Sequence, residues 1–164
     1  MRSISSYPVT GFQFRRGLAG LPGLIASLLL LIAVSLSPAH ALEIPSDEEQ
    51  DVLIRSTLMT FNDANMTGNY TVLLAKASKQ FQSQYSAEQA FAAFEAFRKN
   101  QLFFEAVVTA EYDSWEKAKF DPDGALVLAG VFKTDELEVK YRLRFVQSNK
   151  VWKVLGIKVD ATSL

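Results

Sequence analysis

The chain contains no cysteine and a single histidine, His40. This histidine lies in the stretch 37–41, where the small residues Ala39 and Ala41 are typical of a signal-peptide cleavage site. Cleavage after Ala41 would leave a domain with neither His nor Cys. Most nucleophilic, metal-dependent and neutral-pH acid/base chemistry uses these residue types, so we expect no metal site and no cofactor.

Residues 1–41 have the three parts of a signal peptide. Arg2, Arg15 and Arg16 supply positive charge without any acid, and residues 24–36 form an uninterrupted apolar core. That core is short for a membrane span. We therefore predict an exported protein, periplasmic or secreted, in which a signal peptide precedes one domain over residues 42–164. The alternative is an uncleaved leader that tethers the domain to a membrane.

The charge balance gives no reason to expect a nucleic-acid partner. The formal net charge is −1, and removal of the leader's three arginines leaves −4 on the domain. Without cysteine, the domain must be stabilised by packing, for which most of its aromatic residues lie after residue 60.

Two capping-box patterns predict helix starts in the first half of the domain. Ser46 and Ser86 each stand three residues before a Glu or Gln. The first helix should end at Gly68, and a shorter helix should run from Asn69 to about Ser78. The helix after Ser86 has a broad apolar face suited to packing on a sheet.

Short polar side chains gather at the end of the first helix, at Asn62, Asp63 and Asn65. Such residues compete with helical hydrogen bonds, which explains their presence before a glycine. They can also line the mouth of a pocket. The sequence leaves both interpretations open.

From Phe103 onward the hydrophobic period changes to two, which predicts a meander of strands. Residues 121–124 read Asp-Pro-Asp-Gly, a turn sequence that should join strands at 115–120 and 125–133. The strand over 137–147 alternates most clearly, with apolar residues at every second position.

A tight turn at Ser148-Asn149 should lead into the last strand, 150–160. This turn predicts a register in which Phe145 lies opposite Trp152 and Leu143 opposite Val154. Apolar residues of the last strand would then share the outer sheet face with basic residues of its neighbour, and such a patch favours a homodimer. A shift of one residue would exchange the two faces. The predicted interface comprises Lys140, Arg142, Arg144, Val151, Lys153, Leu155, Ile157 and Val159.

The order of elements, the junction of residues 61–65 with 68–70, and the ending 151–157 resemble the NTF2-like superfamily. The resemblance implies an α+β fold in which three N-terminal helices pack on a curved antiparallel sheet of four to five strands, a cone with an apolar pocket. The superfamily includes ketosteroid isomerase-like enzymes, dehydratases and non-enzymatic binding modules. The pocket residues expected on this basis are Phe61, Phe91, Phe94, Tyr141, Phe145 and Trp152.

The catalytic pattern of the isomerase-like members is incomplete in this chain. Their first helix carries a tyrosine, whereas residues 46–67 contain none, and the connection 76–85 has no acid to serve as general base. We therefore expect a non-catalytic module that binds a small apolar ligand or a protein partner. The alternative is a small metal-free isomerase or dehydratase that uses Tyr141 and a carboxylate. Candidates for that carboxylate are Glu105, Glu111 and Asp113.

Overall fold

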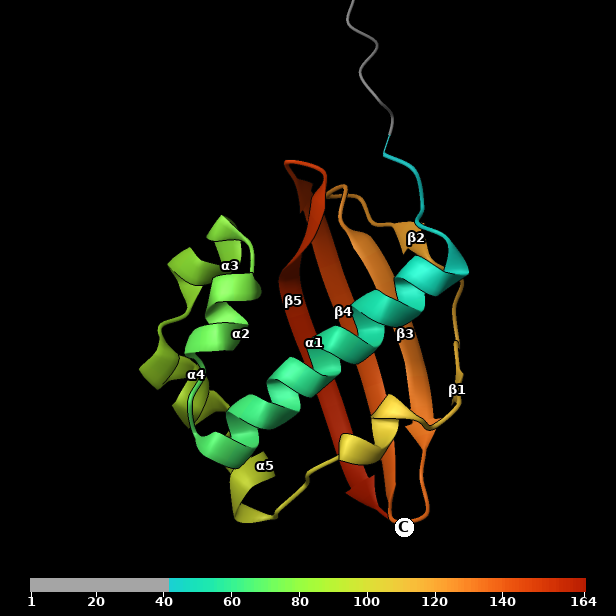
Figure 1. Ribbon diagram of the computed structural model, residues 1–164. Coiled ribbons are helices and arrows are strands. Elements are labelled where there is room, and N and C mark those ends of the chain that lie inside the picture. The colour runs from blue at the N-terminus through green and yellow to red at the C-terminus, as the bar shows by residue number, and fades with distance from the viewer. Residues whose placement is uncertain (1–41) are drawn as a thin grey trace, which may run out of the picture. The chain divides into compact units, whose positions relative to one another are not determined.

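A long helix lies across an antiparallel sheet in the computed structural model, which describes residues 42–164 (Figure 1). This helix, α1 (Asp47–Thr67), begins with the expected capping box: Ser46 Oγ accepts a hydrogen bond from the Glu49 backbone, and the Glu49 carboxylate accepts one from the Ser46 backbone. It ends at Gly68, whose φ of 71° is the left-handed conformation that glycine adopts most easily. Both predicted ends of the helix are confirmed. The predicted leader and its cleavage site lie outside the described residues.

The chain then forms short helices in place of the two longer ones predicted. The segment expected as one helix over 69–78 stops at Ala77, because Ala77 forms a bridge with Val154 and the Ser78 backbone N–H donates to the Val154 carbonyl at 2.7 Å. The helix that begins at the Ser86 capping box is interrupted at Phe94. The short helices are α2 (Thr71–Lys76), α3 (Lys79–Gln84), α4 (Ala87–Ala93), α5 (Glu95–Lys99) and the 3₁₀ turn η1 (Glu105–Val108).

All described strands belong to one antiparallel sheet of order β1-β3-β4-β5, with β2 also paired to β3. The predicted strand over 115–120 is wrong except for its last two residues, because residues 115–118 form a loop. The expected run of strands from Phe103 onward is also interrupted near its start, by η1. The turn at 121–124 is confirmed, and the Gly124 N–H donates to the Asp121 carbonyl at 2.9 Å. The strands are β1 (Tyr112–Asp113), β2 (Lys119–Phe120), β3 (Leu126–Lys133), β4 (Leu137–Ser148) and β5 (Val151–Ser163).

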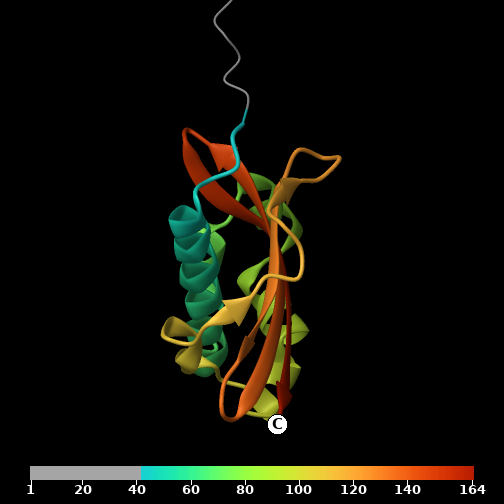
Figure 2. The same cartoon turned by 90° about the vertical axis from the view of Figure 1, so that its right-hand side faces the viewer.

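The core lies between α1 and the sheet face that α1 covers (Figure 2). Leu58 and Phe61 of α1 are fully buried there. The alternating row of β4 points into the same core, as its pattern predicted: Leu137, Val139, Tyr141, Leu143 and Phe145. The α+β class, with helices before an antiparallel sheet, is therefore confirmed.

The predicted register of the last hairpin is wrong. Phe145 lies opposite Val154, and Leu143 lies opposite Ile157. Two causes combine: the turn is formed by Asn149 and Lys150, both with positive φ, and β5 has a bulge opposite Arg144 and Phe145. The extra residue exchanges the faces of β5 beyond this point.

This exchange changes the predicted outer face. Ile157 and Val159 turn to the helix-covered side and pack against the core, so their assignment to the outer face is wrong. Val151 and Lys153 precede the bulge, so the register keeps them on the outer side of the hairpin, although both also line a concavity that the hairpin forms with α1 and α2. The apolar patch that suggested a homodimer is therefore smaller than expected, and the homodimer itself stays a prediction.

Candidate functional site

Three of the six residues predicted to line a pocket belong to the closed core. Phe61, Tyr141 and Phe145 are each at most 1% exposed. The Phe61 ring packs edge-on against Phe94, with ring centroids 4.7 Å apart. The resemblance implies a pocket between the helices and the sheet. In this structure these aromatic side chains fill that space.

The other three predicted pocket residues lie at separate places. Phe91 is 47% exposed on α4, where its ring lies under the Arg98 guanidinium at 3.7 Å. Phe94 and Trp152 are partly buried and line two different concavities. The structure does not bring the six residues together.

The concavity beside Trp152 is a groove of about 200 Å³ between α1, α2 and the β4–β5 hairpin. Its polar groups are already engaged: Lys76 Nζ donates to Thr60 Oγ1 at 2.9 Å, and Thr60 Oγ1 donates to the Ser56 carbonyl at 2.7 Å. The volume is below the roughly 300 Å³ at which pockets for small molecules usually begin.

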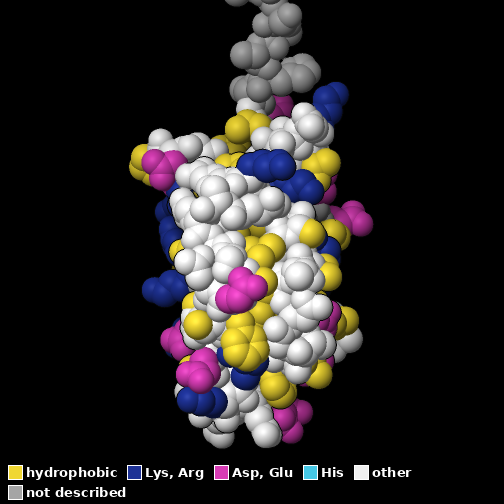
Figure 3. Space-filling model, turned by 90° about the vertical axis from the view of Figure 1, so that its left-hand side faces the viewer, with side chains coloured by type: hydrophobic (Ala, Val, Ile, Leu, Met, Phe, Trp, Pro, Cys, Tyr) yellow, Lys and Arg dark blue, Asp and Glu magenta, His cyan; other side chains and the backbone are white. Residues whose placement is uncertain are grey.

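A larger concavity lies between the short helices and β5, and we call it the helix–strand cleft. Its volume is about 330 Å³. On the side of the molecule that carries these helices, apolar side chains gather in a hollow along the middle of the face (Figure 3). The cleft is lined by Leu73, Phe81, Gln84, Tyr85, Ala90, Ala93, Phe94, Arg144, Leu155, Gly156 and Ile157.

Three features of its walls explain why this cleft stays open. The bridge between Ala77 and Val154, with the hydrogen bond from the Ser78 backbone N–H to the Val154 carbonyl, fixes the start of α3 beside β5. Immediately after that bridge β5 bulges at Leu155, and Gly156 has no side chain to fill the space. The small side chains of Ala90 and Ala93 leave room on the opposite wall.

Arg144 is the one charged group in the cleft lining. Its guanidinium binds the 121–124 turn, with Nε donating to Asp121 at 2.7 Å and Nη2 donating to Asp123 at 2.8 Å. The hydrogen bond to Asp121 raises the pKa of Arg144 further above its usual value. Because these acids already neutralise Arg144, the lining is best suited to an uncharged, apolar molecule.

The tyrosine and carboxylate needed by an isomerase do not face one another in an open site. Tyr141 Oη is buried without a hydrogen-bond partner among the described residues, and burial raises the pKa of this hydroxyl more than the neighbouring Ser114 lowers it. Asp51 lies close enough to influence Tyr141, but its carboxylate accepts a hydrogen bond from Arg55 Nε at 2.7 Å.

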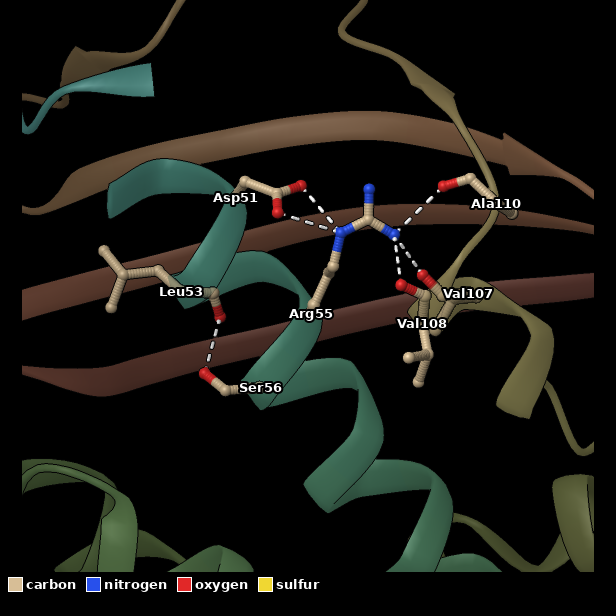
Figure 4. Close-up of polar contacts among 7 residues, drawn as sticks. All are labelled: Asp51, Leu53, Arg55, Ser56, Val107, Val108 and Ala110. Atoms are coloured by element: carbon tan, nitrogen blue, oxygen red, sulfur yellow. Dashed lines mark hydrogen bonds and ion pairs between the residues drawn. The ribbon is translucent and has the colours of Figure 1, made fainter. Parts of the chain in front are cut away.

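Arg55 has a structural role at that position. Beyond Asp51, its Nη1 donates to the carbonyls of Val107, Val108 and Ala110, so it ties α1 to the end of η1 (Figure 4). Nearby, burial and the Asp51 charge raise the pKa of Tyr112. The carboxylate is therefore occupied in holding η1 in place.

Two residues whose role the sequence left open, Asn62 and Asn65, lie in the core and make buried hydrogen bonds. Asn62 Oδ1 accepts a hydrogen bond from the Phe104 backbone at 2.8 Å, and Asn65 Oδ1 accepts one from Tyr70 Oη at 2.6 Å. Both asparagines are at most 2% exposed. They neither end the helix nor line a pocket, and only Asp63, which is exposed, fits a helix-end role. Both asparagines lie on the apolar stripe of α1, and their burial could have been predicted from that position.

Within residues 42–164 no three His, Cys, Asp or Glu side chains lie close enough to hold a metal ion, and no helix is long and apolar enough to cross a membrane. Comparison with protein-family models, curated proteins and solved structures found no match. The likeness to the NTF2-like superfamily therefore stays a prediction from the sequence.

Proposed function

We propose that residues 42–164 form an exported, NTF2-like binding domain without catalytic activity, which takes a small apolar molecule in the helix–strand cleft. The observation that carries the proposal is the composition of the cleft: about 330 Å³ lined mainly by aliphatic and aromatic side chains, with its one charge already paired. Apolar concavities of this size are the usual form of small-molecule sites.

The cleft lining has an exposed polar part and a buried apolar part. Gln84 and Tyr85 lie at the end of α3, are exposed, and supply an amide and a hydroxyl. Leu73 and Phe81 of the same lining are buried, and the Phe81 ring packs against that of Tyr85 with centroids 4.9 Å apart. A ligand with an apolar body and one hydrogen-bonding end fits this gradient best.

The buried polar side chains favour binding over catalysis. Among the described residues they are Thr57, Thr60, Asn62, Asn65 and Ser78, and none of these is a carboxylate. An isomerase of the alternative kind needs an acid whose pKa is shifted by burial beside a tyrosine hydroxyl. Export is supported by the leader sequence alone.

The experiment compares two neighbouring alanines of α4. Ala93 lines the cleft and Ala92 does not, and both are exposed enough for a larger side chain to be accommodated. We expect Ala93→Trp to weaken binding of the uncharged fluorescent apolar probe N-phenyl-1-naphthylamine about tenfold or more, and Ala92→Trp to leave it unchanged. Equal binding by both variants would contradict the assignment of the cleft.

A further inference from the structure

A third concavity, of about 320 Å³, lies on the sheet face that α1 does not cover. The alternation of β4 and β5 places Lys140, Arg142, Lys158 and Asp160 on this face, and Trp115 closes one side. We propose that this concavity binds an acidic saccharide, a pyranose ring that carries a carboxylate.

Trp115 provides a flat apolar surface for the ring. Its side chain is 49% exposed, although a large aromatic residue is normally much more buried. The loop that carries it is held in place by the next residue: the Glu116 carboxylate pairs with Arg142 and with Lys119 Nζ, the latter at 2.6 Å. The indole is therefore presented to solvent from an anchored position.

Two cations of the concavity lie directly opposite each other. Arg142 and Lys158 are partners in the β4–β5 register, an arrangement of like charges that destabilises a sheet. Arg142 is paired with Glu116, whereas Lys158 takes part in no ion pair among the described residues. A carboxylate bound between the two cations would remove their repulsion and complete the charge balance of Lys158.

The remaining charged groups of the concavity, Lys140 and Asp160, can form hydrogen bonds with sugar hydroxyls. Asp160 lies opposite Lys140 in the register, so an acceptor and a donor stand side by side. Sugar hydroxyls both donate and accept hydrogen bonds, and charged partners make such bonds stronger. A simple anion would make no use of Trp115. An apolar ligand would leave Lys158 without a partner, since Arg142 pairs with Glu116 and Lys140 pairs with Glu138.

Calorimetric titration of the protein with a galacturonate trisaccharide tests the proposal, with the neutral galactose trisaccharide and acetate as comparisons. We expect the acidic trisaccharide to bind best, and Trp115→Ala and Lys158→Gln each to weaken it about tenfold. Lys150→Gln, at the hairpin turn outside the concavity, serves as the control and should change nothing. The indole N–H signal of Trp115 should also shift on binding in NMR spectra.

Several results would overturn the proposal. Absence of binding, or equal binding of the neutral trisaccharide, rules out an acidic-sugar site. Equal affinity for acetate, or unchanged affinity in Trp115→Ala, reduces the concavity to a simple anion site. Because the concavity and the helix–strand cleft share no lining residue, these results leave the apolar-probe experiment unaffected.

Discussion

The ring of Tyr141 lies against Gly130, its register partner on β3, so closely that a Cβ at Gly130 would stand 2.5 Å from the Tyr141 hydroxyl oxygen and 2.7 Å from the Asp113 carbonyl. The absence of a side chain at Gly130 is thus what allows the buried tyrosine to pack between β3 and β1. The contact places the Tyr141 hydroxyl in the core, where it has no hydrogen-bond partner among residues 42–164.

Gly130→Ala should therefore destabilise the domain by about 1 to 3 kcal/mol, the usual cost of overpacking. Gly156→Ala is the matched control, since its Cβ would meet only the Arg144 side chain at 3.6 Å or more, an ordinary contact. Urea unfolding of both variants measures the difference. Equal stability of the two variants would show that Tyr141 can move away without cost.

Asn62→Ala should cost about 1 to 3 kcal/mol, because it leaves the buried Phe104 N–H without an acceptor. Asp63→Ala changes the adjacent, exposed residue and should stay within about 0.5 kcal/mol of the parent protein. Thermal unfolding distinguishes the two, and a change of similar size in both would contradict the buried role of Asn62.

Arg55→Met keeps most of the side chain's length but removes its hydrogen bonds to the carbonyls at the end of η1. We expect faster amide hydrogen exchange in residues 105–112, with little change in β4. Lys99→Met provides the control, because the exposed pair of Lys99 with Glu95 contributes only about 0.5 kcal/mol or less. Unchanged exchange near η1 in Arg55→Met would show that packing alone holds the segment.

Stability should depend on pH through Asp121. Partial burial raises the pKa of this carboxyl, but hydrogen bonds from the Ala125 backbone and Arg144 outweigh that effect and lower it overall. A pKa that is lower in the folded state means that the stabilisation is present above the unfolded pKa of about 3.9 and is lost as pH falls through the folded value. Urea unfolding between pH 7 and 2 should show this decline, and Asp121→Asn should reduce it. If Asp121→Asn and the parent protein showed the same pH dependence of the unfolding free energy, Asp121 would not be its source.

The features predicted correctly from the sequence are those that depend on residues close together in the chain. The capping boxes at Ser46 and Ser86, the stop at Gly68 and the Asp121 turn each depend on side chains within a few positions of the backbone they serve. The alternation of β4 likewise follows from burial on one face only.

The features that were missed depend on contacts between distant segments. Leu155 bulges next to the point where α3 meets β5 through Ala77 and Val154, and no local pattern marks it. That one residue changed the faces of β5 and moved Ile157 from the predicted interface into the lining of the helix–strand cleft. The cleft could not be predicted from the sequence because its walls follow from this shift.

The most direct test of the binding proposal is an NMR titration of the protein with the apolar probe, observed at the methyl groups of Leu, Ile, Val and Ala. We expect saturable shifts at Ala90, Leu155 and Ile157, which line the helix–strand cleft, and little change at Leu53 and Val151 in the groove beside Trp152. Shifts confined to Leu53 and Val151, or spread over the whole surface without saturation, would contradict it.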